Sequence, residues 1–232
     1  MARCTKEEAL ETRSRILDAA ENVFHAQGVA HTSLANVAEA ANVTRGAIYW
    51  HFRNKSDLFD AMCERVRLPM EAMVEAGAES GEADPLGCLR ATSIFVLKEA
   101  AHNPHSRKVF DILFHKCEFV DESDPILVRQ RECYMKGMAN LERILGNAID
   151  RKQLPPDLDL HLAGLALHAT VDGLLNKWLF MPDSFRLASC AERLIDACLD
   201  TLRYAPSLRK ARGKGAPASM PAPDEATVSA AH

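Results

Sequence analysis

The chain has 232 residues, of which 47% are hydrophobic and 6% aromatic, and its formal net charge at pH 7 is −4. This length and apolar content suffice for one large or two small domains, and the weak net charge excludes a histone-like protein that binds DNA by overall charge. The first residues lack the apolar segment of a signal peptide, and no run of about 18 apolar residues predicts a membrane span. We therefore expect a cytoplasmic protein without membrane association, whose seven cysteines are reduced thiols.

The first 54 residues contain the start signals of three helices. Thr5 and Glu8 have the spacing of a capping box for a helix that runs to about residue 26. Thr32 or Ser33 would cap a short second helix, and Thr44 a third over about residues 45–51. The apolar face of the first helix is expected to contain Leu10, Ile16, Ala20, Val23 and Phe24. These signals predict an N-terminal helix-turn-helix domain over residues 1–54.

Residues 38–58 carry the most informative pattern, AEAANVTRGAIYWHFRNKSDL. Ala38 and Ala41 allow two helices to approach closely, and Asn42 tolerates the left-handed backbone of a tight turn. No carboxylate lies between Glu39 and Asp57, whereas the basic residues Arg45, Arg53 and Lys55 do. A surface without negative charge suits a polyanion, so this segment predicts a helix that reads DNA.

The rest of the chain also predicts helices. One begins near Lys55 and runs to about residue 78, and proline at the first helical position marks others near 85–101, 104–117 and 125–151. Two more are expected at about 158–180 and before Pro206. The nine helices predict an all-α fold with a second domain over residues 55–206. Residues 207–232, rich in Ala, Pro, Gly and Ser, are predicted to be a disordered tail.

The pattern of residues 38–58 resembles the signature of the TetR family of bacterial repressors. Asn42 stands where most members carry Gly, which also accepts a positive φ. Three later segments, PLGCLR at 85–90, HKCEF at 115–119 and VDGLLNKWLFMPDS at 171–184, resemble the multidrug-sensing repressors of the AcrR and TtgR type. The resemblance implies a nine-helix fold, with a C-terminal domain that binds ligands and dimerises. It also implies repression of a multidrug efflux operon, relieved by hydrophobic drug-like or plant-derived compounds. The matching positions of the signature are Ala38, Ala41, Val43, Gly46, Tyr49, His51, Phe52, Lys55 and Leu58.

The resemblance and the helical pattern together predict how DNA would be bound. Arg45 can donate two hydrogen bonds to a guanine edge, and Tyr49 and Trp50 can pack on thymine methyl groups or sugars. Phe52 is expected to point into the core with Ile48. Other family positions contact phosphates, which set the register of the protein on the duplex. The predicted DNA-binding residues are Thr32, Ser33, Thr44, Arg45, Gly46, Ala47, Tyr49, Trp50, His51 and Lys55.

A twofold dimer is expected, because one such domain reads only a short half-site of a palindromic operator in double-stranded DNA. The last two helices are more apolar than a single bundle requires, and two from each subunit would form a four-helix interface. The alternative is that these residues belong to an ordinary core. The residues concerned are Leu162, Leu165, Ala166, Ala169, Leu187, Ala191, Leu194, Ile195, Cys198, Leu199 and Leu202.

The resemblance also implies an apolar effector pocket in the C-terminal domain. Asp172 is notable there, because a carboxylate within an apolar helix needs a donor or a cationic ligand; the alternative is a structural hydrogen bond to a neighbouring helix. Phe110 and Phe114 stand where polar residues are common in this branch, which favours apolar compounds. The positions that match the pocket are Val66, Leu89, Thr92, Ser93, Val96, Phe110, Phe114, Leu141, His168, Val171, Asp172 and Asn176.

Other functions have weaker support in the sequence. No nucleophile elbow, phosphate loop or Ser/His/Asp spacing predicts an enzyme, and neither a cofactor nor a metal is expected. His161 and His168 lie seven residues apart, ~10 Å along a helix, which is too far for a compact zinc site. A redox switch at a cysteine stays open, although apolar neighbours favour inert thiols. Two rivals also stay open: a fatty-acid or acyl-CoA-responsive regulator, and a small-molecule binding protein without operator specificity.

Overall fold

The computed structural model describes residues 6–118 and 121–211, and within them the chain forms nine α-helices, one 3-10 helix and no strand. The predicted all-α fold is confirmed, and the helices begin and end close to the predicted residues. They are α1 (Lys6–Gln27), α2 (Leu34–Ala40), α3 (Arg45–His51), α4 (Lys55–Gly77), α5 (Pro85–His102), α6 (Pro104–His115), α7 (Pro125–Asp150), α8 (Leu160–Phe180), α9 (Leu187–Tyr204) and the 3-10 helix Pro206–Leu208.

Three helices begin at proline, as predicted, and each is capped by the side chain before it. Asp84 accepts a hydrogen bond from the Gly87 backbone N–H, Asn103 from those of His105 and Ser106, and Asp124 from that of Ile126. Proline costs nothing at this position, because the first backbone N–H groups of a helix have no intrahelical partner. Local sequence therefore sets where α5, α6 and α7 start.

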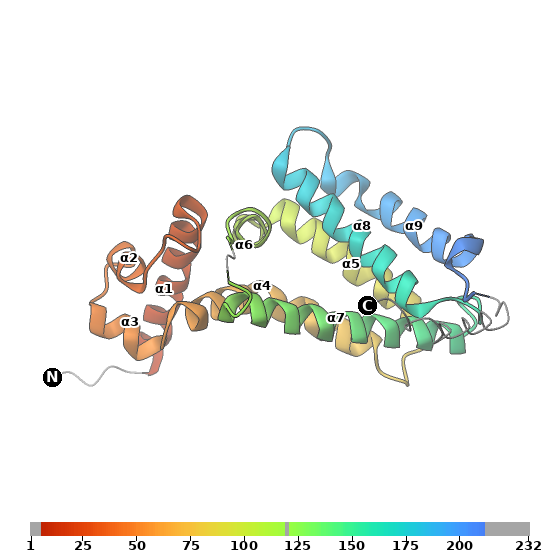
Figure 1. Cartoon of the computed structure of the whole chain (residues 1–232), viewed down its shortest axis with the longest axis horizontal. Coiled ribbons are helices and arrows are strands. Elements are labelled where there is room, and N and C mark those ends of the chain that lie inside the picture. Colours follow the sequence, from red (N-terminus) through yellow and green to blue (C-terminus); the bar gives the residue numbers. More distant parts are fainter. Residues whose placement is uncertain (1–5, 119–120, 212–232) are drawn as a thin grey trace, which may run out of the picture.

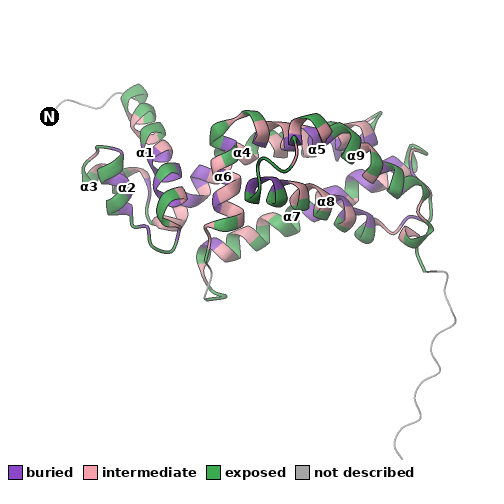
Figure 2. Ribbon diagram, turned by 90° about the horizontal axis from the view of Figure 1, so that it is seen from above, coloured by how far each residue is buried: buried purple, intermediate pink, exposed green. Residues whose placement is uncertain are grey.

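The head, which we define as α1–α3, packs around a core closed by the first turns of α4 (Figure 1). Phe24 of α1 and Phe59 of α4 meet edge to face with ring centroids 5.9 Å apart. Leu10, predicted on the apolar face of α1, is instead exposed, because the head core begins only at Ile16. The N-terminal turns of α1 project beyond the core and are coloured as exposed or intermediate in Figure 2.

The body, which we define as α4–α9, has a core of its own between α5 and α7–α9. Three of its helices, α4, α6 and α7, also contribute to the head core, and the contribution of α7 is Ile126. α4 gives Phe59 and Met62 to the head core, whereas its Val74 packs against the body core. α6 gives Val109 and Ile112 to the head core, and Figure 1 shows it end-on between head and body. Helices α4, α6 and α7 thus have residues in both cores, and the domain boundary expected between residues 54 and 55 stays a prediction.

The chain after α9 stays ordered longer than the sequence predicted. The Asp159 N–H donates to the Leu208 carbonyl at 2.9 Å, and the Lys210 N–H donates to the Asp157 carbonyl at 2.8 Å. The prediction of disorder is therefore wrong for residues 207–211. Backbone hydrogen bonds to the segment before α8 hold these residues in place. Residues 212–232 of the predicted tail lie outside the described residues. None of the described helices has the length and apolar character that crossing a bilayer requires.

Candidate nucleic-acid interface and ligand cavity

The turn between α2 and α3 has the conformation predicted for it. Asn42 adopts φ 52°, in the left-handed region, and Ala38 and Ala41 are buried where the two helices approach. The Val43 N–H donates to the Ala38 carbonyl at 3.0 Å and closes the turn. The angle between α2 and α3 therefore depends on a backbone geometry that few residue types tolerate.

We expect Asn42→Ala to lower the free energy of unfolding by about 1 kcal/mol, because alanine lacks the polar side chain that eases a positive φ. Asn42→Gly is the matched control and should leave stability unchanged or slightly higher. Urea unfolding followed by circular dichroism measures both. Equal stability of the alanine variant and the wild type would contradict a strained turn.

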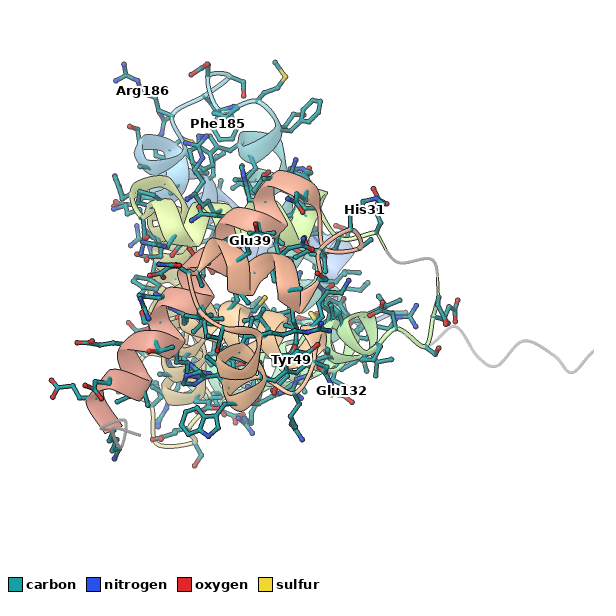
Figure 3. All side chains as sticks on the ribbon, turned by 90° about the vertical axis from the view of Figure 1, so that its left-hand side faces the viewer. His31, Glu39, Tyr49, Glu132, Phe185 and Arg186 are labelled. Atoms are coloured by element: carbon teal, nitrogen blue, oxygen red, sulfur yellow. The ribbon has the colours of Figure 1, made fainter. Side chains whose placement is uncertain are left out.

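Helix α3 presents two faces, as predicted. The Thr44 hydroxyl caps the helix by accepting from the Ala47 N–H at 3.1 Å. Ile48 and Phe52 are buried in the head core, whereas 48% of Tyr49 and 73% of Trp50 are exposed. Figure 3 views the molecule from the head end and labels Tyr49 on this outer surface. The two large aromatic side chains thus have no partner in the described core and are available to a ligand.

The exposed face of α3 is also free of compensating carboxylates. Arg45 stacks over the Tyr49 ring at 5.9 Å, and no carboxylate among the described residues pairs with it. Packing within the chain does not require glycine at position 46, because an added Cβ would meet only the Thr44 hydroxyl, at 3.9 Å. No contact within the described chain explains glycine here, and a bare backbone lets an external partner approach closely. The arrangement suits direct contact with a DNA groove.

Arg13 of α1 belongs to this surface and was missed in the sequence. Its guanidinium lies over the Phe52 ring at 5.3 Å. Partial burial, and then the charge of Arg13, lower the pKa of His51 below the usual imidazole value. His51 is therefore neutral at pH 7 and offers one N–H donor. No motif could have revealed Arg13, because it lies on another helix far from the signature.

Two of the predicted DNA-binding side chains, those of Thr32 and Lys55, donate hydrogen bonds within the chain. Thr32 is buried, and its hydroxyl donates to the Gly28 carbonyl at 2.7 Å, so its side chain does not reach a duplex. Ser33, not Thr32, caps α2, in a reciprocal pair with Asn36. The Lys55 ammonium donates to the Val29 and Ala30 carbonyls at 2.7 and 3.2 Å. Lys55 therefore holds the turn between α1 and α2, and one of its three protons is left for a phosphate.

An apolar cavity of about 240 Å³ lies between α4, α5, α7 and α8. Eight of the twelve predicted ligand-binding residues line it. They are Leu89, Thr92, Ser93, Val96, Leu141, His168, Val171 and Asp172, joined by Val74, Gly137, Ile144 and Leu167. The Thr92 and Ser93 hydroxyls donate to carbonyls of their own helix, which leaves the cavity wall predominantly apolar.

The other four predicted ligand-binding residues lie elsewhere. Phe114 and Asn176 line a neighbouring hollow of about 530 Å³, which Asp172 also borders. Val66 lines a smaller cavity of about 180 Å³ between α1, α4, α5 and α6. Phe110 is half-buried against the body core and borders none of these spaces. Most of the residues predicted for one ligand pocket therefore line a single cavity. The others were assigned to the same pocket but lie in separate spaces between the helices.

Asp172 is less buried than its apolar helix suggested. Its side chain is 44% exposed, and its carboxylate lies 3.1 Å from Nδ1 of His168, one turn earlier on α8. The partner is thus on the same helix and not on a neighbouring one. The hydrogen bond to Asp172 raises the pKa of His168. The Tyr134 ring of α7 meets the His168 ring edge to face at 5.2 Å, which fixes the imidazole at the cavity wall.

This pair predicts a pH-dependent contribution to stability. Because the pKa of His168 is raised in the folded state, the contribution is complete below the unfolded value of about 6.5 and is lost as pH rises through the folded value. We expect Asp172→Asn to destabilise the fold by less than about 1 kcal/mol at pH 5.5, given the exposure of the pair, and by nothing at pH 9. Urea titrations at both pH values measure the difference; an equal loss at both would contradict the assignment.

Neither a metal site at His161 and His168 nor a redox switch at Cys63 or Cys117 gains support from the structure. His161 is paired with Glu142 at 2.8 Å and His168 with Asp172. Burial raises the pKa of Cys63, and burial raises that of Cys117 to about 11. Thiols that stay protonated at pH 7 react slowly with oxidants, so these two cysteines are poor candidates for a redox switch.

Comparison with known proteins agrees with this geometry. Residues 16–62 match the tetR family of bacterial regulatory proteins, and residues 84–204 match the C-terminal region of MAATS-type transcriptional repressors. The transcriptional regulator TtgR of Pseudomonas putida is 43% identical over 210 residues, which cover 90% of this chain and 100% of TtgR. Such relatives are transcriptional regulators and not enzymes.

Two solved structures have the same arrangement of helices. NalD, the secondary repressor of the MexAB-OprM multidrug efflux pump in Pseudomonas aeruginosa, is 33% identical with a TM-score of 0.74, over 85% of this chain and 98% of NalD. The complex of triclosan with SmeT, a repressor from Stenotrophomonas maltophilia, is 31% identical with a TM-score of 0.75, over 89% and 99%. With its helix-turn-helix head, its all-helical body and these relatives, the chain belongs to the TetR family of transcriptional repressors, which bind operator DNA.

Proposed function

We propose that this repressor controls a multidrug efflux operon and leaves its operator when a hydrophobic compound occupies the body. The observation that carries this proposal is the apolar cavity of about 240 Å³ in the body of a chain whose head exposes DNA-binding groups. The relatives NalD and SmeT support it, since both are repressors of efflux pumps. Because a bacterial operator lies in the cytoplasm, the repressor would act there.

In this proposal the head binds a palindromic operator through α3. Arg45 reads a base edge in the major groove, and Tyr49 and Trp50 pack beside it. Ser33, Thr44 and His51, the backbone at Gly46 and Ala47, and the remaining Lys55 proton would contact phosphates, which set the register. We do not include Thr32 among the proposed DNA contacts, because its hydroxyl donates to the Gly28 carbonyl. We also propose that the functional division into domains falls within α4.

The proposed dimer uses an apolar face of α8 and α9 that no other part of the described chain covers. Leu162 and Leu165 of α8 and Leu194 of α9 are exposed, and we assign them to this face. Most of the apolar residues predicted on α9 do not belong to it, because Leu187, Ala191, Ile195, Leu199 and Leu202 are buried in the body core of the same subunit. The four-helix interface would therefore be built mainly from α8, with Leu194 as the contribution of α9.

The proposed effector is a flat, apolar molecule with few polar groups. Apolar side chains dominate the cavity wall, and the Asp172–His168 pair offers one polar anchor. No lysine or arginine of the described chain lines this cavity, which disfavours a sensor of fatty acids or acyl-CoA, whose carboxylate or phosphates need a cation. A binding protein without operator specificity is disfavoured by the uncompensated charge of Arg45.

The test is a fluorescence-anisotropy titration with the intergenic DNA beside the gene for this chain, at fixed salt, because phosphate contacts make affinity salt-dependent. Triclosan and a polyhydroxylated aromatic are then added to the complex. Tight binding that triclosan relieves, and the polyhydroxylated compound does not, is the expected result. Tight binding that neither relieves would refute the effector proposal, and absence of specific binding would refute the operator proposal.

A further inference from the structure

Glu21 of α1 is a buried carboxylate at the junction of head and body. Only 1% of the residue is exposed. Its carboxylate oxygens lie 3.3 Å from Nη1 of Arg65 on α4 and 2.7 Å from Nδ1 of His105 on α6. A buried charge is stable only when its partners stay in place, so Glu21 fixes α1 relative to both α4 and α6.

Further contacts join α1 to α6 on either side of this carboxylate. Lys108 Nζ donates to Asn22 Oδ1 at 2.7 Å, and His25 Nε2 lies 3.0 Å from the Asp111 carboxylate. We call this row of polar contacts, together with Glu21–His105, the α1–α6 seam. Beneath it, Val109 and Ile112 are buried in the head core. One face of α6 therefore moves with the head.

The opposite side of α6 contacts the body. The Arg107 guanidinium lies 4.8 Å from the centre of the Trp178 ring on α8, and Phe110 packs against the body core. Phe114 borders the hollow that Asp172 shares with the apolar cavity. A molecule that enlarges the hollow would push on α6 at Phe114, whereas the α1–α6 seam holds α6 to the head.

Helix α4 has a weak point beside the seam. Pro69 lies inside α4 and has no N–H, so the Arg65 carbonyl lacks its helical donor. The cavity of about 180 Å³ between α1, α4, α5 and α6 is lined by Pro69, Arg65, Glu21 and His105, among others. A helix that lacks a hydrogen bond next to unfilled space can bend there at low cost, and the bend would fall between the parts of α4 in the two cores.

Asp18, Glu21 and His105 also have the spacing of a metal site, with ligand atoms within 4.8 Å of one another. Nη1 of Arg65, however, lies 2.7 Å from Asp18 and 3.3 Å from Glu21. One guanidinium already contacts both carboxylates, so the cluster is better explained as a structural contact between helices.

We propose that the Glu21–His105 contact, anchored by Arg65, is a latch through which the state of the head and the state of α6 are coupled. It rests on the proposed function, because it transmits effector occupancy to operator affinity. Glu21 and His105 are positioning residues, since neither lines the apolar cavity nor lies on α3. By linkage, DNA bound at the head must tighten the latch by as much as an open latch weakens DNA binding.

The chain offers a matched pair of variants. His105 Nδ1 contacts Glu21 at 2.7 Å with 58% of its side chain exposed, and His161 Nδ1 contacts Glu142 at 2.8 Å with 71% exposed. The first pair joins head and body, whereas the second joins α7 and α8 within the body. His105→Ala cuts the latch and leaves Glu21 paired with Arg65, and His161→Ala is the control. Glu21→Gln keeps the shape of the side chain and removes its charge.

The experiment is hydrogen–deuterium exchange on the full chain, free and bound to the intergenic DNA. In the wild type and His161→Ala, DNA should slow exchange in α3 and also in α6. In His105→Ala and Glu21→Gln, exchange in α6 of the free protein should rise about tenfold or more, as expected for loss of a hydrogen bond to a charged group. DNA should then protect α3 but not α6.

Exchange in α6 that is the same in His105→Ala, Glu21→Gln and the wild type would overturn the latch, and so would undiminished protection of α6 by DNA. Failure of the proposed function gives a different result: no variant would then show DNA-dependent protection of α3. In that case the exchange rates of the free proteins alone would decide whether the latch holds α6.

Discussion

Arg45→Ala is expected to weaken specific operator binding by roughly 1–3 kcal/mol for each half-site. A dimer that contacts two half-sites would lose the contact twice, which corresponds to about 30-fold or more in the dissociation constant. The structural reason is that Arg45 is exposed at the start of α3 and has no carboxylate partner among the described residues. Its removal therefore changes nothing in the head except the contact to DNA and a stacking on Tyr49.

The matched control is Arg143→Ala, an exposed arginine on α7 whose described partner is Asn140. It removes the same charge from the chain and should leave operator affinity within about twofold, because surface charges beyond a Debye length are screened. Anisotropy titrations of both variants at one salt concentration separate local from overall charge effects. Similar losses in both variants would mean that Arg45 acts only through net charge.

The sequence predicted the helix starts of the body and the α2–α3 turn of the head well, because these features have local constraints. Pro85, Pro104 and Pro125 with their capping residues mark helix starts, and Asn42 marks a turn with positive φ. Such features depend on backbone geometry within a few residues. The burial of Ile48 and the exposure of Tyr49 likewise follow from helical periodicity alone.

The features that the sequence did not predict depend on contacts between distant segments. Nothing near Thr32 in the sequence shows that its hydroxyl is turned towards Gly28. The pairing of Glu21 with His105 joins residues 84 positions apart, and periodicity assigns each of them only to a helix face. The family resemblance assigned Val66 and Phe110 to one pocket with the other ligand-binding positions. Matching positions in a sequence do not show which helices lie between the side chains.

The second large effect is expected at the proposed dimer interface. Leu165→Glu should raise the dimer dissociation constant by about 100-fold or more, because a carboxylate would be buried without a partner at the centre of an apolar contact. Leu165 is 42% exposed in the single chain and lies on α8 one turn from Leu162, with the exposed Leu194 on α9. Operator affinity at nanomolar protein should fall with dimerisation, because one head contacts only a half-site.

Leu68→Glu is the control, because Leu68 is 56% exposed on α4 and lies outside the α8–α9 face. It introduces the same charge and should leave the dimer intact. Sedimentation velocity over a range of concentrations reports the association, and circular dichroism confirms that each variant is folded. If Leu165→Glu stays dimeric while folded, the interface lies on another surface. The position of the two heads relative to each other would then be set by that surface and not by α8 and α9.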